Sequence, residues 1–440
     1  MTNPFKAVLD IRRHELPLAL LMFSYFFLVI TSFWILKPIK KALFIQFYDS
    51  TGFTLLNWHM TASQAELVAK VLNMVVAIVA VIAFTWLSRH FRRQQLTYCF
   101  SAFFLAGYAL YTPIIANPTG LTVWTFYLFG DLFSTLMVAT FFVFVNDSVT
   151  AEEAKRLYGL IGLGGVVGGV IGTSVVRVWI DDLDRVDWLW VCFAIAIAII
   201  MIAMFAGRFV TIRDEPAIEA KHERQKEHGN PALEGAQLVF KSRFLLAIAA
   251  VVGLYEIVST LLDFQFTSTI SHYLDGDAIG RQFSMVFALT NWISMFVQLF
   301  LTSFVMTRFG LTTALMVLPV MILAGSVGFL IFPVLWIGSS LNTVDNGFSY
   351  SINQSAKETL YVPTTKDEKY KAKAFVDMFL QRFAKALAVG VSLIVTLIFV
   401  EFDSIRYLSL LTVVLIVLWL WAVRYAGQRF DELASKQTSA

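Results

Sequence analysis

Long apolar runs dominate this sequence and limit what it can fold into. An α-helix needs about 20 apolar residues to cross the hydrocarbon core of a bilayer, which is about 30 Å thick. Of the 440 residues, 58% are hydrophobic and only 15% are charged, whereas a soluble domain usually carries about 25% charged residues. We therefore expect an all-α integral membrane protein with 12 transmembrane helices. The predicted spans are 15–37, 60–88, 94–116, 119–147, 153–178, 187–208, 243–272, 280–307, 311–332, 333–356, 370–400 and 404–426.

Basic residues are distributed unevenly between these spans. Lys and Arg collect in the short cytoplasmic loops of membrane proteins. If the N-terminus lies inside, the inside segments carry most of the loop Lys and Arg. The outside segments then carry only Arg177, Arg185, Arg281 and Arg406. This bias predicts that both termini are cytoplasmic.

The longest polar stretch between spans lies near the middle of the chain, with six predicted spans on each side. The sequence thus predicts an N-terminal six-helix bundle over 1–210, a cytoplasmic linker over 211–242 and a C-terminal six-helix bundle over 243–440. Weak internal similarity supports related halves, since Glu152–Tyr158 is similar to Lys366–Lys371. Parallel six-span repeats are typical of major facilitator transporters, whose substrate site lies near the membrane midplane. We expect a 6+6 pseudo-symmetric, major-facilitator-like fold.

Several charged residues fall inside or at the margins of the predicted spans. Each costs about 2.5–3.5 kcal/mol at a helix centre, so such residues normally face the bundle interior. Lys37 and Lys40 share one helix face, and Arg382 and Lys385 share another. Lys and Arg suit anions, above all phosphates. The pattern indicates either a cavity that binds an organic anion or salt bridges that lock the two halves together.

Other intramembrane charges have simpler interpretations. Glu66 and Lys70 are spaced i,i+4 and can pair with each other. Lys41 either extends to the headgroups or contacts substrate, and Asp147 is a solvated or gating carboxylate near the inner surface. Asp345 lies at comparable depth without an assigned role. The candidates for gating or ion pairing are Lys41, Glu66, Lys70, Asp147, Glu256, Glu358 and Asp377.

A run of glycines on the fifth predicted span gives overlapping G-x-x-x-G pairs, which allow close helix packing. The run lacks the Gly-Lys-Ser/Thr of a phosphate-binding loop. The histidines show no metal-binding spacing, and Cys99 and Cys192 give no disulfide framework. We expect no metal, no cofactor and no catalytic residues.

Two segments resemble a known family. Ala356–Pro363 reads Ala-Lys-Glu-Thr-Leu-Tyr-Val-Pro, and Lys369–Asp377 reads Lys-Tyr-Lys-Ala-Lys-Ala-Phe-Val-Asp. Both are similar to signatures of the ATP/ADP translocase (nucleotide transporter) family of plastids and intracellular bacteria. The loop motif Glu152–Tyr158 and the following Gly162-Leu-Gly164 resemble that family as well.

This resemblance implies a twelve-span exchanger for nucleotides or related anions. Four charged positions that matter in the family look like Lys40, Asp131, Asp263 and Lys357, with aspartates in place of glutamates. The family's R-x-x-K-D pattern reads here Lys37-Pro-Ile-Lys40-Lys41, so a basic residue stands where a carboxylate is usual. The predicted substrate-binding residues are Lys37, Lys40, Asp131, Asp263, Lys357, Arg382 and Lys385.

Together these patterns predict a secondary-active transporter for a phosphorylated organic anion, with ATP or ADP the leading candidate. We expect it to be a monomer in a bacterial cytoplasmic (inner) membrane, with the lipid bilayer and a small anionic substrate as partners and no nucleic acid. Two alternatives remain open. One is a flippase of the same fold for an anionic lipid or lysolipid, and the other is a membrane-embedded enzyme or scaffold.

Overall fold

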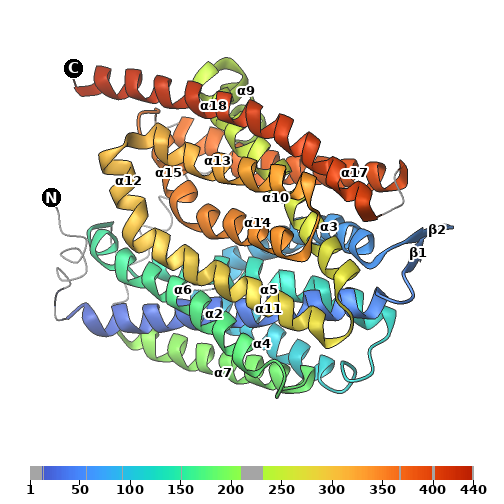
Figure 1. Ribbon diagram of the computed structural model, residues 1–440. Coiled ribbons are helices and arrows are strands. Elements are labelled where there is room, and N and C mark those ends of the chain that lie inside the picture. The colour runs from blue at the N-terminus through green and yellow to red at the C-terminus, as the bar shows by residue number, and fades with distance from the viewer. Residues whose placement is uncertain are drawn as a thin grey trace. The chain divides into compact units, whose positions relative to one another are not determined.

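The computed structural model describes residues 12, 14–55, 57–91, 93–149, 151–209, 231–365, 368–398 and 402–438. Almost all of this chain is helical (Figure 1). The expectation of a purely α-helical protein needs one correction, since β1 (Phe53–Leu55) and β2 (Trp58–Met60) form an antiparallel hairpin with Phe53 opposite Met60. Asn57, between the strands, has a φ of 66°, which tight hairpin turns require. Most of the predicted linker, residues 211–230, lies outside the described residues.

The first of two compact units contains the chain up to Phe209 together with Asp275–Asn291. In this unit α2 packs against α6, α5 and α7, and its 33 residues include Pro38. The unit ends within a helix, because α11 continues past Asn291. Its helices are α2 (Leu16–Tyr48), α3 (Ala62–His90), α4 (Arg93–Tyr111), α5 (Gly120–Asn146), α6 (Ala151–Trp179), α7 (Arg185–Phe209) and the first part of α11 (Asp277–Phe296).

The second unit contains the described residues from Pro231 to Leu274 and from Trp292 onward. Four π-helical segments, η1 to η4, interrupt its α-helices. Such segments are rare and often mark functional sites. Its elements are α9 (Pro231–Lys241), α10 (Arg243–Tyr273), η1 (Val297–Leu301), α12 (Thr302–Arg308), α13 (Gly310–Ile331), α14 (Leu335–Phe348), η2 (Ser349–Asn353), α15 (Gln354–Leu360), η3 (Glu368–Ala372), α16 (Lys373–Phe375), η4 (Val376–Leu380), α17 (Gln381–Ile398), the 3₁₀-helix η5 (Phe402–Ile405) and α18 (Arg406–Thr438).

Among the described residues, 10 helices are long and apolar enough to cross a membrane. Large apolar side chains on them face outward, as Ile82 and Trp421 do with 65% and 71% of their surface exposed. The chain is therefore a multi-pass membrane protein. Two predicted spans are not among the ten: 94–116, whose helix α4 begins with the polar Arg93-Gln-Gln, and 333–356, which is divided among α14, η2 and α15.

The glycine run of α6 is a packing surface against α2. A Cβ atom at Gly164, Gly168 or Gly172 would come within 2.6, 2.5 or 2.8 Å of a carbonyl oxygen of α2. Those oxygens belong to Phe23 and Phe27 for the first two glycines. The contacts repeat every four residues on both helices, so the two backbones touch along a stripe. The structure thus places these glycines in the packing role that their spacing predicts.

Replacing Gly168 by Ala is expected to destabilise the protein by about 1–3 kcal/mol, the usual cost of overpacking. The added methyl would overlap the carbonyl oxygen of Phe27 on α2. Gly162→Ala on the same helix is the matched control, because no atom lies within 4 Å of its added Cβ. Thermal unfolding in detergent measures the difference. Equal melting temperatures for the two variants would contradict the packing role.

Candidate functional site

Three helices of the first unit bring charged side chains together inside its membrane-spanning segments. Helix α2 contributes three lysines, α3 a glutamate and a lysine, and α5 a tyrosine and an aspartate. We call this group the lysine cluster; its members are Lys37, Lys40, Lys41, Glu66, Lys70, Tyr127 and Asp131.

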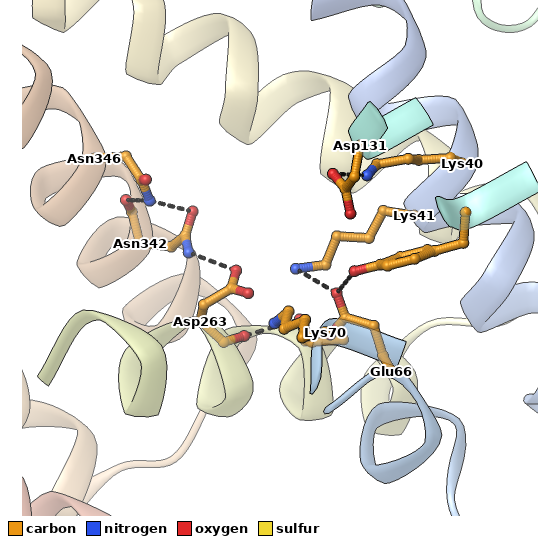
Figure 2. Close-up of polar contacts among 10 residues, drawn as sticks. Lys40, Lys41, Glu66, Lys70, Asp131, Asp263, Asn342 and Asn346 are labelled. Atoms are coloured by element: carbon orange, nitrogen blue, oxygen red, sulfur yellow. Dashed lines mark hydrogen bonds and ion pairs between the residues drawn. The ribbon is translucent and has the colours of Figure 1, made fainter. Parts of the chain in front are cut away.

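Lys40, in the second half of α2, is the most enclosed base of the cluster. Its ammonium group pairs with the Asp131 carboxylate on α5 (Figure 2), and its side chain is 5% exposed. The Nζ atom also lies 4.5 Å from the ring centroid of Tyr127, which precedes Asp131 by one turn. A Cβ atom on Gly130 would come within 2.7 Å of the Lys40 Cδ atom. A glycine at 130 therefore makes room for the long side chain beside its carboxylate.

Glu66 joins three further groups of the cluster. Its carboxylate, fully buried, lies 3.4 Å from Lys41 Nζ and 3.1 Å from Lys70 Nζ (Figure 2). The Tyr127 hydroxyl donates a hydrogen bond of 3.0 Å to the same carboxylate. The predicted i,i+4 pair between Glu66 and Lys70 is thus present, and Lys41 contacts the same carboxylate. Lys41 does not extend to the headgroups, because its side chain is 6% exposed and turned toward Glu66.

Aromatic rings also contact two of the lysines. Lys37 Nζ lies 4.4 Å from the ring centroid of Trp34 and 4.9 Å from that of Phe287 on α11. Lys41 Nζ lies 5.2 Å from the ring centroid of Phe283, one turn earlier on α11. Such rings attract cations. The lysine cluster therefore combines four lysines, two carboxylates and the aromatic rings that contact them.

The second unit arranges its buried polar groups differently. Helix α10 and the α14–η2 segment run antiparallel, and their polar side chains meet at successive turns. Asn342 donates to Asp263 at 3.3 Å (Figure 2), and Ser259 donates to Asp345 at 2.6 Å. The hydroxyls of Tyr255 and Ser349 form the third contact. We call this set the polar ladder; its members are Tyr255, Ser259, Asp263, Asn342, Asp345 and Ser349.

The predicted bases of this unit lie around the end of the ladder. Lys357 on α15 is buried, and its Nζ lies 5.1 Å from the ring centroid of Tyr255. Lys385 on α17 lies 3.4 Å from the Glu256 carboxylate, and nearly half of its side chain surface is exposed. Arg382 precedes Lys385 by one turn on the same helix and is half-buried. The structure thus places Asp263 beside an amide and Glu256 beside a base.

Three predicted gating residues lie in more exposed positions. Asp147 caps the C-terminus of α5 through its backbone. Glu358 pairs with Lys373, and Asp377 lies exposed in η4.

An ion pair that the sequence did not reveal lies at the start of α2. Arg156, within the Glu152–Tyr158 motif, donates to the Glu15 carboxylate just before α2 begins. This hydrogen bond with the guanidinium holds the pKa of the Glu15 carboxyl below its usual range. The motif therefore fixes the start of the helix that carries Lys37, Lys40 and Lys41.

Sequence reasoning missed the neutral members of both groups. Tyr127 and Tyr255 read as ordinary aromatic residues, and their partners lie far away in the chain. A usable signal does exist in the tenth predicted span. There polar residues recur every three or four positions in an apolar run, at Asn342, Asp345, Ser349 and Asn353.

Comparisons with known proteins agree on family and fold. A family model described as TLC ATP/ADP transporter matches residues 118–430. The ADP,ATP carrier protein 1 of Chlamydia muridarum (strain MoPn / Nigg) is 26% identical over 493 residues, covering 96% of this chain and 90% of that protein.

Two crystal structures resemble this protein over nearly their whole length. The nucleoside transporter NupG matches with a TM-score of 0.64 at 12% identity, covering 93% of this chain and 99% of that one. FucP, a Major Facilitator Superfamily transporter in the outward conformation, matches with a TM-score of 0.51 at 14% identity, covering 94% and 99%. The fold of this chain is therefore similar to that of these two transporters.

Proposed function

We propose that this chain, which belongs to the TLC ATP/ADP transporter family, is a secondary-active transporter that moves nucleotides such as ATP and ADP across a membrane by alternating access. The name of the Chlamydia relative supports this substrate. The proposal involves no covalent chemistry, because a transporter of this kind binds and releases its substrate unchanged.

The gathering of lysines in the lysine cluster is the observation that carries the proposal. Four lysines and two carboxylates lie together inside the membrane-spanning segments. Burying unneutralised charge is costly unless a partner of opposite sign is available. The phosphate groups of a nucleotide supply that charge, and Lys is a common phosphate ligand. The phosphates of a bound nucleotide would therefore bring negative charge to this group of bases.

Exchange of partners gives each charged residue a role in the cycle. Asp131 holds Lys40 in position. An incoming phosphate would compete with that carboxylate for the ammonium group, so the ion pair would be lost when substrate binds. Lys41 and Lys70, which share Glu66, would gate by the same exchange.

The second unit would contribute in a similar way. Lys357 is buried against a tyrosine ring and has no carboxylate within ion-pair distance among the described residues. Lys385 would leave Glu256 for substrate, and Arg382, one turn away, would add a bidentate donor. Asp263 would stay bound to Asn342 or pair with these bases during the cycle.

The wider architecture follows from the same proposal. We infer twelve spans in two six-helix bundles, 1–210 and 243–440, joined by a cytoplasmic linker over 211–242. The steep excess of loop Lys and Arg on one side supports cytoplasmic termini. The bacterial relatives support a bacterial cytoplasmic membrane as its location. A monomer suffices, because all the proposed binding residues lie in one chain.

Purified protein in proteoliposomes is expected to take up radiolabelled ATP or ADP with saturation. Lys40→Ala and Lys357→Ala should each reduce uptake about tenfold or more, since a hydrogen bond to a charged group contributes about 1.5–3 kcal/mol. Lys357→Arg, which keeps the charge, should retain more uptake than Lys357→Ala.

Lys241→Ala is the control for these variants, because Lys241 is an exposed base at the end of α9. Its uptake should equal that of the natural sequence. Uptake that survives Lys40→Ala and Lys357→Ala unchanged would overturn the site assignment. Movement of a labelled anionic lipid, with no competition from nucleotide, would favour a flippase instead.

Reporter fusions at the C-terminus test the orientation in bacterial cells. A green fluorescent protein fused after Ala440 should fluoresce, and an alkaline phosphatase at the same position should be inactive, because the phosphatase needs the oxidising side of the membrane to form its disulfides. The reverse pattern would place the C-terminus outside.

A further inference from the structure

Asp345 on α14 is a buried acid that the proposed substrate contacts do not use. Its side chain has no exposed surface. One carboxyl oxygen, Oδ2, accepts a hydrogen bond of 2.6 Å from the Ser259 hydroxyl. The other, Oδ1, has no hydrogen-bond partner among the residues that the structure describes. A single hydroxyl is thus the only group bound to this carboxyl within the described chain.

Among the residues that the structure describes, no base pairs with Asp345. From α10, the titratable groups that face Asp345 are Glu256, Asp263 and the neutral Tyr255. Helix α13, which also packs on α14, carries no titratable residue. Tyr350 on η2 adds only a phenol.

Two bases of this unit that contact members or neighbours of the ladder have partners of their own. Lys357 lies on the Tyr255 ring and Lys385 lies beside Glu256. In the described residues, no basic nitrogen comes within the 4.0 Å that defines an ion pair with Asp345. Its charged neighbours, Glu256 and Asp263, are both acidic and would repel an ionised carboxylate.

A carboxylate that is buried without a base takes up a proton, because the charged form loses its hydration and gains nothing in return. Protonation also removes the repulsion from Glu256 and Asp263. In addition, it gives the carboxyl a hydrogen that it can donate within the polar ladder. The geometry around Asp345 therefore favours the neutral acid.

Polar groups beside Asp345 provide a path by which a proton on its carboxyl could reach water. Asp345 stands one turn before η2, a π-helical segment, and such segments often occur at functional sites and at helix kinks. Ser349, a member of the polar ladder, and Asn353 both lie in η2. Asn353 is 1% exposed, and neither its amide nitrogen nor its amide oxygen has a hydrogen-bond partner among the described residues. A buried amide in this state calls for water, which would connect the ladder to bulk solvent.

We propose that Asp345 is the proton-binding site of this transporter. It carries a proton in the conformation described here, releases it to water when the ladder opens, and regains one from the opposite side. Proton binding and nucleotide movement are thereby coupled. The inference rests on the proposed transport function, but it concerns a residue and a ligand, the proton, that the nucleotide contacts do not involve.

Proteoliposomes that contain the full chain and a trapped pH-sensitive dye test this directly. With the natural sequence, uptake of labelled ATP should fall by up to about tenfold per pH unit above a titration midpoint, as for any process that needs one protonated acid. Proton movement should accompany ATP uptake. Asp345→Asn keeps the size of the side chain but cannot ionise. It should still bind ATP, as a rise in melting temperature reports, while its uptake becomes independent of pH and moves no proton.

Two further variants make the result specific. Asp431→Asn alters an exposed acid at the end of α18 and should keep the natural pH dependence and proton movement. Ser259→Ala keeps the carboxyl but removes its hydrogen bond, so it should stay pH-dependent with a displaced midpoint. This variant reports on Asp345 even if Asp345→Asn fails to fold.

The outcomes separate the two proposals. If the natural sequence takes up no nucleotide, the proposed function fails. If it takes up nucleotide without pH dependence or proton movement, only the Asp345 assignment fails. The assignment also fails if Asp345→Asn keeps both properties, or if Ser259→Ala leaves the midpoint unchanged.

Discussion

The energetic cost of holding charge inside a membrane shapes this molecule more than any other constraint. Each buried lysine of the first unit is described with a definite partner: Lys40 with Asp131, Lys41 and Lys70 with Glu66, and Lys37 with aromatic rings. Nearby glycines make room for these contacts. A glycine at 130 leaves space for one lysine, and the glycine stripe of α6 brings the helix that carries three of them into close packing.

The two units meet this constraint in different ways, and the difference has functional consequences. The lysine cluster gathers bases in ion pairs, which suits a phosphorylated ligand. In the polar ladder, by contrast, the acid Asp345 accepts a hydrogen bond from the neutral Ser259. The proposals assign proton binding to this acid and anion binding to the bases of the lysine cluster. One fold can therefore provide both elements that coupled transport requires.

Much of this could be predicted from the sequence, and the remainder has a physical explanation. Apolar runs identify most of the helices, and i,i+4 spacing identifies Glu66 with Lys70, because both depend only on local chain geometry. The pair Lys40–Asp131 joins residues 91 positions apart, so family resemblance singled out both residues but no local pattern paired them. The polar ladder depends on the antiparallel packing of α10 and α14, and the division of α11 after Asn291 depends on tertiary contacts. No local sequence pattern indicates the polar ladder or the division of α11.

Nucleotide-dependent thermal unfolding tests most directly whether nucleotide phosphates bind the buried lysines in place of protein carboxylates. A ligand that binds only the folded state stabilises it by about 2.7 kcal/mol at a concentration 100 times its Kd. ATP and ADP should therefore raise the melting temperature of the natural sequence. They should do so much less for Lys40→Ala and Lys357→Ala. Equal shifts in all three proteins, or no shift in any, would contradict this account.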